Sequence, residues 1–214
     1  MNKKNNSKKY APYLDSKTKR YLDIFGSLIL LIPALIIIST FAIIIIVTEG
    51  KPALFTQKRV AKNLKLFSMT KLRTLKTNAK PYMPSYNSDL NPYLIPFGKF
   101  LRAHRLDELP QLFSVIKGDM SLVGPRPELL QEIKKYKGPG KKRFQIKPGL
   151  TGLWQIKAPR NTSMHHNKKY DLFYLRKANM KMDLWILAKT AAFVLKKNDG
   201  NENRIYSHKI SFYN

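Results

Sequence analysis

A run of 24 consecutive residues without a charged side chain, residues 24–47, constrains this chain more than any other feature. As a straight helix it would be about 36 Å long, enough to cross a hydrocarbon core of about 30 Å. A cleaved signal peptide is a poor alternative, because the run is too long and no cleavage site of small residues follows it. We therefore predict that this run attaches the protein to a membrane.

Pro33 divides the run into two segments, each too short to cross a bilayer alone. Proline lacks the N–H that would bond the carbonyl of Ile29, so we expect a kink or a break at Pro33. Residues 1–20 and 51–73 are both rich in Lys and Arg, and the positive-inside rule therefore places both flanks in the cytoplasm. These features favour a helix that enters the membrane, breaks and returns. A kinked helix that spans the membrane is the alternative.

The chain is strongly basic, with 40 Lys and Arg against 13 Asp and Glu and a formal net charge of +27. A charge of this size indicates anionic partners, which include nucleic acid, an anionic membrane surface and phosphorylated substrates. The chain has no cysteine, which excludes disulfides, Cys-ligated zinc and a cysteine nucleophile. The charge alone does not choose between the remaining classes.

Asp107 and Glu108 are the one adjacent pair among the acidic residues. Helix capping explains one acid just before Pro110, but it explains neither the second acid nor the upstream Arg102 and Arg105. A carboxylate among cations can attack phosphorus, and a neighbouring carboxylate can hold the Mg²⁺ that neutralises phosphate oxygens. The pair is therefore a candidate catalytic site for phosphoryl chemistry.

A second motif, Pro125-Arg126-Pro127, follows about twenty residues later. The two prolines restrict the backbone on either side of Arg126, and so they limit where its guanidinium group points. A guanidinium group is a planar donor that suits phosphate. We interpret Arg126 as a candidate phosphate ligand.

The segment from Leu101 to Pro127, LRAHRLDELPQLFSVIKGDMSLVGPRP, closely resembles the bacterial sugar transferase family of monotopic phosphoglycosyl transferases. Members of that family move a phosphosugar from a nucleotide-diphosphate sugar to polyprenyl phosphate and so begin a membrane-linked glycan. The resemblance covers nearly the whole chain. It includes Lys19-Arg20-Tyr21-Leu22-Asp23, Gln57-Lys58-Arg59-Val60, Lys71-Leu-Arg73, Pro148-Gly149-Leu-Thr151-Gly152 and Asp171-x-x-Tyr174.

The resemblance implies a UDP-sugar donor, an undecaprenyl-type polyprenyl phosphate acceptor, Mg²⁺ and a covalent phosphosugar intermediate, with release of UMP. It also implies a monotopic protein in the bacterial inner membrane, with its active site on the cytoplasmic face and membrane lipids as partners. A homo-oligomer is compatible with it. The roles that it implies are the nucleophile for Asp107, the Mg²⁺-associated carboxylate for Glu108, the lipid-phosphate ligand for Arg102, the nucleotide-proximal element for Pro125, Arg126 and Pro127, and the membrane-helix break for Pro33.

The expected fold is α/β and dominated by helices, with a re-entrant membrane helix, amphipathic interfacial helices and a small cytoplasmic globular part. We expect a basic tail at residues 1–20, the membrane helix at 21–48, a catalytic domain at 49–200 and a C-terminal tail at 201–214. Short strands are expected on either side of a basic turn between residues 53 and 67. The apolar residues of a last helix, 182–197, suit a membrane surface and a protein core equally well.

Several positions depart from the family pattern or keep two interpretations. Ile32 replaces the usual Ser before the membrane proline, Ala61 a usual Gly, and Ala158-Pro159-Arg160 a usual Gly-Arg pair. Arg143, in a Lys-rich loop, either attracts phosphate groups or is merely solvated. His104 and the pair His165-His166 are weak candidates for proton transfer and metal binding.

A membrane-anchored nucleic-acid-binding protein is the competing hypothesis. It explains the charge and the apolar run, but it gives no role to Asp107, Glu108 or Arg126. The chain also lacks zinc-finger spacing, an aromatic RNA-binding motif and a basic heptad region. We therefore expect no nucleic-acid partner.

Overall fold

The computed structural model describes residues 10–79, 91–157 and 168–195. In these ranges helices predominate, and the named strands form two small two-stranded sheets, which confirms the predicted helix-dominated α/β class. Part of the predicted N-terminal tail and all of the predicted C-terminal tail, 201–214, lie outside the described residues. Residues 10–20 belong to the folded body, since Ala11 is buried and its N–H donates to the carbonyl of Leu175 at 2.8 Å.

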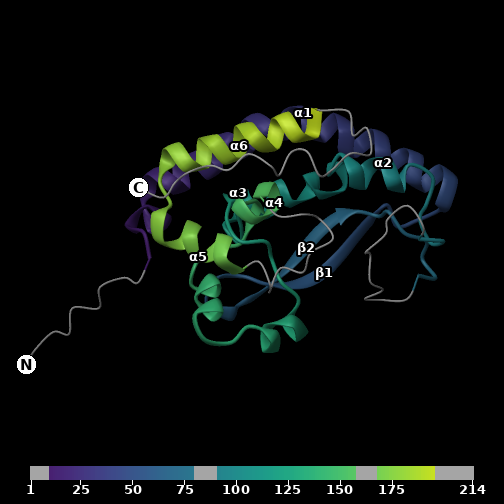
Figure 1. Ribbon diagram of the computed structural model, residues 1–214. Helices are drawn as coiled ribbons and strands as arrows, with labels where there is room; N and C mark the ends of the chain where they lie inside the picture. The colour runs from purple at the N-terminus through teal and green to yellow at the C-terminus, as the bar shows by residue number, and fades with distance from the viewer. Residues whose placement is uncertain (1–9, 80–90, 158–167, 196–214) are drawn as a thin grey trace, which may run out of the picture.

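Helix α1, Lys17–Glu49, contains the whole apolar run in 33 residues. The side-chain oxygen of Ser16 accepts from the Lys19 N–H at its start, and Gly50, at φ +70°, follows its end. The helix is continuous through Pro33, so the predicted break is absent. Proline removes one backbone hydrogen bond, but its fixed φ is helical, so the chain bows without leaving the helix. Figure 1 shows α1 bowed along one side of the molecule.

Most of α1 faces away from the protein. By length and composition it is the one helix in the described part of the chain that could cross a membrane. Ala34 and Ile45 are its buried apolar residues. The large apolar side chains that it exposes are Tyr21, Phe25, Leu28, Ile29, Leu30, Ile32, Leu35, Ile36, Ile43, Ile46 and Val47.

Buried polar groups attach the N-terminal end of α1 to the globular body. The Lys19 ammonium lies 2.7 Å from the Asp183 carboxylate of α6, Met180–Leu195. The Asp23 carboxylate accepts from the Ser121 hydroxyl and the Leu122 N–H of strand β3, Ser121–Val123. Since buried charges are stable only when they are paired, this end of the helix is fixed in one place.

The C-terminal end of α1 is attached to the same body. The Arg73 side chain donates from Nη2 to the carbonyls of Glu49 and Gly50, at 3.1 and 2.6 Å. Ile45 packs in a cluster of buried apolar residues that includes Leu72 and Leu101. Both ends of the apolar helix therefore contact one globular body.

Strands β1, Leu54–Val60, and β2, Leu66–Leu72, form an antiparallel hairpin, as predicted. A parallel pair joins β3 to β4, Gly149–Thr151. The largest buried core contains Leu112, Val115, Met120, Leu122, Leu175 and Ile186.

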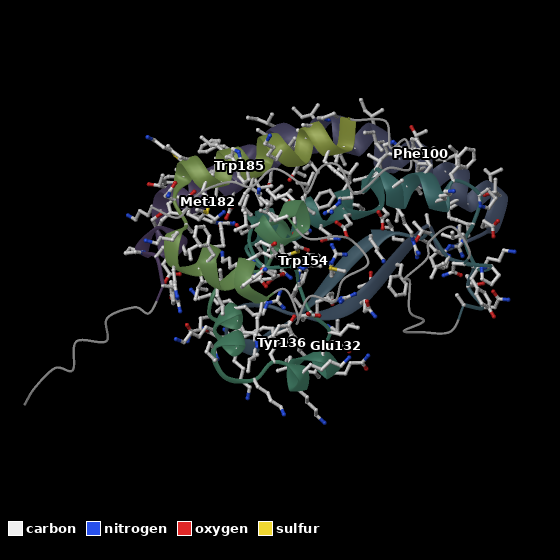
Figure 2. All side chains as sticks on the ribbon, viewed as in Figure 1. Phe100, Glu132, Tyr136, Trp154, Met182 and Trp185 are labelled. Atoms are coloured by element: carbon white, nitrogen blue, oxygen red, sulfur yellow. The ribbon has the colours of Figure 1, made fainter. Side chains whose placement is uncertain are left out.

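Helix α6 lies along the same side of the molecule as α1 (Figure 1). Its buried residues include Asp183 and Ile186, whereas Leu184 is 48% exposed. Ala188, Ala191 and Ala192, from the apolar set predicted for this helix, are also exposed. Figure 2 shows Met182 and Trp185 on this upper side. The structure therefore favours a surface-lying helix over one buried in a core.

Candidate active site

The two acidic residues lie in the first turn of a short helix, just after a tight turn of the chain. Helix α2 is Gly98–Ala103, and the 3₁₀ helix η4, Leu106–Gln111, follows it. Between them Arg105 adopts a left-handed conformation, φ +56°, which turns the chain sharply. Asp107 and Glu108 thus begin η4, in its first turn, and η4 packs against β2.

Asp107 is a buried carboxyl group with only 6% of its surface exposed. Burial, together with the charge of Glu108, raises the pKa of Asp107 to about 6, although Lys71, Arg102 and Arg126 act in the opposite direction. The sequence suggests that neighbouring cations keep this carboxylate ionised; in the structure, burial outweighs them. Asp107 therefore titrates close to neutral pH, where a small change in its surroundings alters its charge.

The pKa of Glu108 shifts in the opposite direction, because its carboxylate is paired with Arg126. Its Oε1 accepts from Nη2 of Arg126 at 2.8 Å. Burial by itself raises the pKa of Glu108, but the charges of Arg126, Arg105 and Lys71 outweigh it, and the pKa lies below its usual range. The two neighbouring carboxyl groups therefore titrate in different pH ranges, and Asp107 takes up a proton at a higher pH than Glu108.

Lys71 is a site residue that the motifs identified only as part of a resembling segment. It pairs with Phe55 across the β1–β2 hairpin, and its Nζ lies 5.6 Å from the centre of that ring. Burial lowers the pKa of Lys71, and the nearby Asp107 and Glu108 carboxylates partly offset this. The alternation of side chains along a strand could have indicated that Lys71 points toward the protein, since it shares a face of β2 with the buried Phe67 and Met69.

Arg102 has an unused donor at the site. Its Nε donates to the Thr74 hydroxyl at 2.8 Å, whereas its buried Nη1 has no hydrogen-bond partner among the described residues. Its charge also reaches Asp107. A buried donor without a partner is costly, so an anion that accepts from Nη1 would be stabilised here.

The comparisons with known proteins show the family of the chain. The family model described as bacterial sugar transferase matches residues 14–197, which include every site residue described above. The chain belongs to the bacterial sugar transferase family. The chain is 36% identical over 202 residues, which cover 88% of the chain and 44% of the relative, to the galactosyl transferase CpsE of Streptococcus agalactiae serotype III (strain NEM316).

Two further relatives differ in how much of their length is covered. The undecaprenyl-phosphate galactose phosphotransferase of Salmonella typhimurium (strain LT2) is 32% identical over 203 residues, 86% of this sugar transferase and 43% of the relative. An uncharacterized sugar transferase of Bacillus subtilis (strain 168), EpsL, is 33% identical over 177 residues, 83% of this chain and 87% of the relative. The chain thus spans less than half of some curated relatives and most of another.

The site of the sugar transferase assembles residues from several parts of the chain. Asp107, Glu108 and Arg126 are brought together as the two motifs suggest, and Arg102 lies close enough to affect Asp107. Pro125 and Pro127 flank Arg126 in the loop after β3. Pro33 lies inside α1, which continues through it.

The weaker candidates lie elsewhere. The His104 ring stacks against Phe100 with ring centres 4.4 Å apart, and its Nδ1 lies 3.0 Å from the Phe100 carbonyl oxygen. Arg143 is only 3% exposed, which corrects both interpretations of it as a surface cation. His165-His166 and Ala158-Pro159-Arg160 lie outside the described residues.

The donor set fits a Mg²⁺ ion that substrate phosphates help to hold. In the described ranges no group of three or more His, Cys, Asp or Glu side chains could enclose a metal. Mg²⁺ commonly binds through one or two carboxylates and substrate phosphates, and it keeps several waters. Glu108 could supply such a carboxylate, and an added cation would also relieve the repulsion between Asp107 and Glu108.

Proposed function

We propose that this chain is a phosphoglycosyl transferase that moves a phosphosugar from a UDP-sugar to undecaprenyl phosphate, the first membrane step of a glycan pathway. The observation that carries the proposal is the buried Asp107, with a pKa of about 6, beside the lysine and arginines that act on it. A carboxylate in such surroundings suits attack on a phosphate, whose oxygens the cations neutralise. The names of several relatives, among them the Salmonella phosphotransferase, state this class of reaction for those proteins.

The first step forms a covalent intermediate on Asp107. A carboxylate oxygen of Asp107 attacks the sugar-bearing phosphorus in line, the bond from that phosphorus to the bridging oxygen breaks, and UMP leaves with the electron pair. Lys71 and Arg126 stabilise the charge on the phosphate oxygens. Glu108 and the substrate phosphates would hold Mg²⁺, which would supply charge neutralisation at the same oxygens.

The second step transfers the phosphosugar to the lipid. The unused Nη1 donor of Arg102 suits the acceptor phosphate. A phosphate oxygen of the acceptor attacks the phosphorus of the intermediate, and Asp107 leaves as a carboxylate. The product is the sugar linked by a diphosphate to the lipid, and the enzyme returns to its starting charge.

The membrane position follows from the attachment of α1. Its two ends contact the same globular body, through Asp183 at one end and Arg73 at the other. A helix attached in this way suits insertion from one side rather than crossing. The protein would therefore be monotopic in the bacterial inner membrane, with α1 dipping into the cytoplasmic leaflet and α6 at the interface. This arrangement holds the site at the depth of the acceptor's phosphate.

The reaction can be tested by UMP release from purified protein in detergent, with undecaprenyl phosphate, Mg²⁺ and a panel of UDP-sugars. Intact mass measurement without the acceptor should show one phosphosugar added to the wild-type chain and none to Asp107→Asn. A folded wild-type protein that releases no UMP from any donor would overturn the assignment. Turnover by Asp107→Asn at a rate close to wild type would instead overturn the covalent route.

A further inference from the structure

The loop that carries Arg126 is held through its carbonyl groups. Pro125 and Pro127 have no N–H, so the backbone on either side of Arg126 cannot donate. The Pro125 carbonyl accepts from the Gly149 N–H at 2.8 Å, and the Glu128 carbonyl accepts from the Val60 N–H at 2.9 Å. The Arg126 carbonyl, which lies between them in the chain, is bound by a side chain.

That side chain is Arg143, whose Nη2 donates to the Arg126 carbonyl at 2.9 Å. Its Nε donates to the Asp171 carboxylate at 2.8 Å, and its Nη1 to the Tyr136 hydroxyl at 2.9 Å. Nη1 also lies 3.3 Å from the Glu128 carboxylate, to which Tyr136 donates as well. Every nitrogen of the guanidinium group therefore has a partner.

The ring of Tyr136 fixes the plane of the Arg143 guanidinium as well. The central carbon of that group lies 4.8 Å from the Tyr136 ring centre and 5.5 Å from that of Phe144. Figure 2 shows Tyr136 in the lower part of the molecule, away from α1 and α6. In the described structure, the hydrogen bond from Arg143 to the Arg126 carbonyl joins this cluster to the loop that carries Arg126.

We propose that Arg143 is a positioning residue for the transferase reaction: it holds the Arg126 backbone so that the Arg126 guanidinium group stays against Glu108. The connection is short, from Arg143 Nη2 to the Arg126 carbonyl and from Arg126 Nη2 to Glu108 Oε1, at 2.9 and 2.8 Å. The proposal rests on the function proposed above for Arg126. A lysine could keep the charge of Arg143, but it lacks the planar fork that binds Asp171, Tyr136 and a backbone carbonyl at once.

The test compares Arg143→Lys with Arg20→Lys. Arg20 also donates to backbone carbonyls, those of Val115 and Ile116 at 2.7 and 2.6 Å, but it contacts no part of the Arg126 loop in the described structure. Each protein is treated with phenylglyoxal, and modification of Arg126 is followed by peptide mass. The kcat and KM for UMP release are measured on the same preparations, together with thermal unfolding.

We expect Arg126 of Arg143→Lys to react several-fold faster than in wild type. Its kcat should fall about tenfold to a hundredfold with a smaller change in KM, because misplaced transition-state contacts cost rate more than binding. Arg20→Lys should change unfolding without changing Arg126 labelling. If Arg143→Lys does not fold, Tyr136→Phe, which removes one support of Arg143, should raise the labelling rate by a smaller factor.

Two outcomes would overturn the proposal. The first is Arg126 labelling and kcat within twofold of wild type in a folded Arg143 or Tyr136 variant. The second is a loss of kcat that simply follows thermal stability in both the Arg143 and the Arg20 variants. If the wild-type protein releases no UMP, the proposed function fails, but the labelling comparison still tests whether Arg143 positions Arg126.

Discussion

The guanidinium group of Arg126 lies 2.8 Å from the carboxylate of Glu108, the immediate neighbour of Asp107. This pairing keeps the buried Asp107 carboxyl group and the half-buried Glu108 carboxyl group chemically distinct. Arg126 contributes to the lowered pKa of Glu108, whereas burial dominates at Asp107 and raises its pKa. One acid can then hold a cation while the other acts as a nucleophile whose charge depends on its surroundings.

Replacing Arg126 with methionine should remove this distinction. Glu108 loses the strongest of its opposing charges, so its pKa rises, and the phosphate oxygens lose a planar donor. We expect kcat for UMP release to fall by about a hundredfold, as for other donors that stabilise transition-state charge. The control is Lys117→Met, since the Lys117 side chain is 77% exposed and pairs only with Asp119 in the described structure. Equal losses in both variants would show that net charge, rather than Arg126, matters.

The pH dependence of the first step should follow Asp107. Its pKa is raised to about 6, so the nucleophile is ionised above this value and becomes protonated as the pH falls through it. Single-turnover UMP release should therefore decline below about pH 6, rather than near pH 4 as for an ordinary aspartate. Rapid-quench measurements between pH 4.5 and pH 8 on stable protein would check this. An unchanged rate down to pH 4.5 would contradict the role of Asp107 as a buried nucleophile.

Lys71 should be required although no motif singles it out. Lys71→Met removes an ammonium group that acts on both Asp107 and Glu108, so the pKa of Asp107 should rise further and the acid limb should move to higher pH. We also expect a loss of about tenfold or more in kcat/KM, from weaker stabilisation of the phosphate. The matched control is Lys58→Met in the same hairpin, because Lys58 is exposed and bonds the Ser68 hydroxyl. A wild-type pH profile in Lys71→Met would contradict the assignment.

The parts of the site that depend only on residues adjacent in the chain could be predicted from the sequence. Asp107 and Glu108 are adjacent, and two prolines constrain Arg126, so their chemistry was visible without a structure. The role of Lys71 could not be predicted in this way, because its place at the site depends on how β2 packs against η4. Arg143 was misread for a similar reason: it lies among lysines in the chain, but its partners Asp171 and Glu128 are distant in sequence.

The apolar helices show the same limit. A window of residues shows that α1 and α6 are apolar, but it does not show which face each presents or where its ends are attached. The sequence predicts a kink or a break at Pro33. The helix does not break there, because one lost hydrogen bond does not end a helix whose two ends are fixed by Asp183 and Arg73. In α6, likewise, the structure shows that Leu184 is exposed while the neighbouring Asp183 is buried.

The course of α1 relative to the membrane can be tested with cysteines, since the chain has none of its own. Lys17→Cys and Lys51→Cys flank the helix and should leave its buried contacts intact. If α1 dips into one leaflet, an impermeant maleimide should label both positions from the cytoplasmic side only, in inverted vesicles but not in intact spheroplasts. Ile36→Cys, on the exposed apolar face, should resist labelling in both preparations.

A helix that crosses the membrane gives a different pattern. One of the two flanking cysteines would then react in spheroplasts and the other in inverted vesicles, and the shared attachment of both ends to the globular body could not hold in the membrane. Labelling of both positions from the cytoplasmic side would instead mean that the contacts of Lys19 and Arg73 persist there. The apolar helix would then hold the active site at the level of lipid phosphates without carrying any part of the chain across.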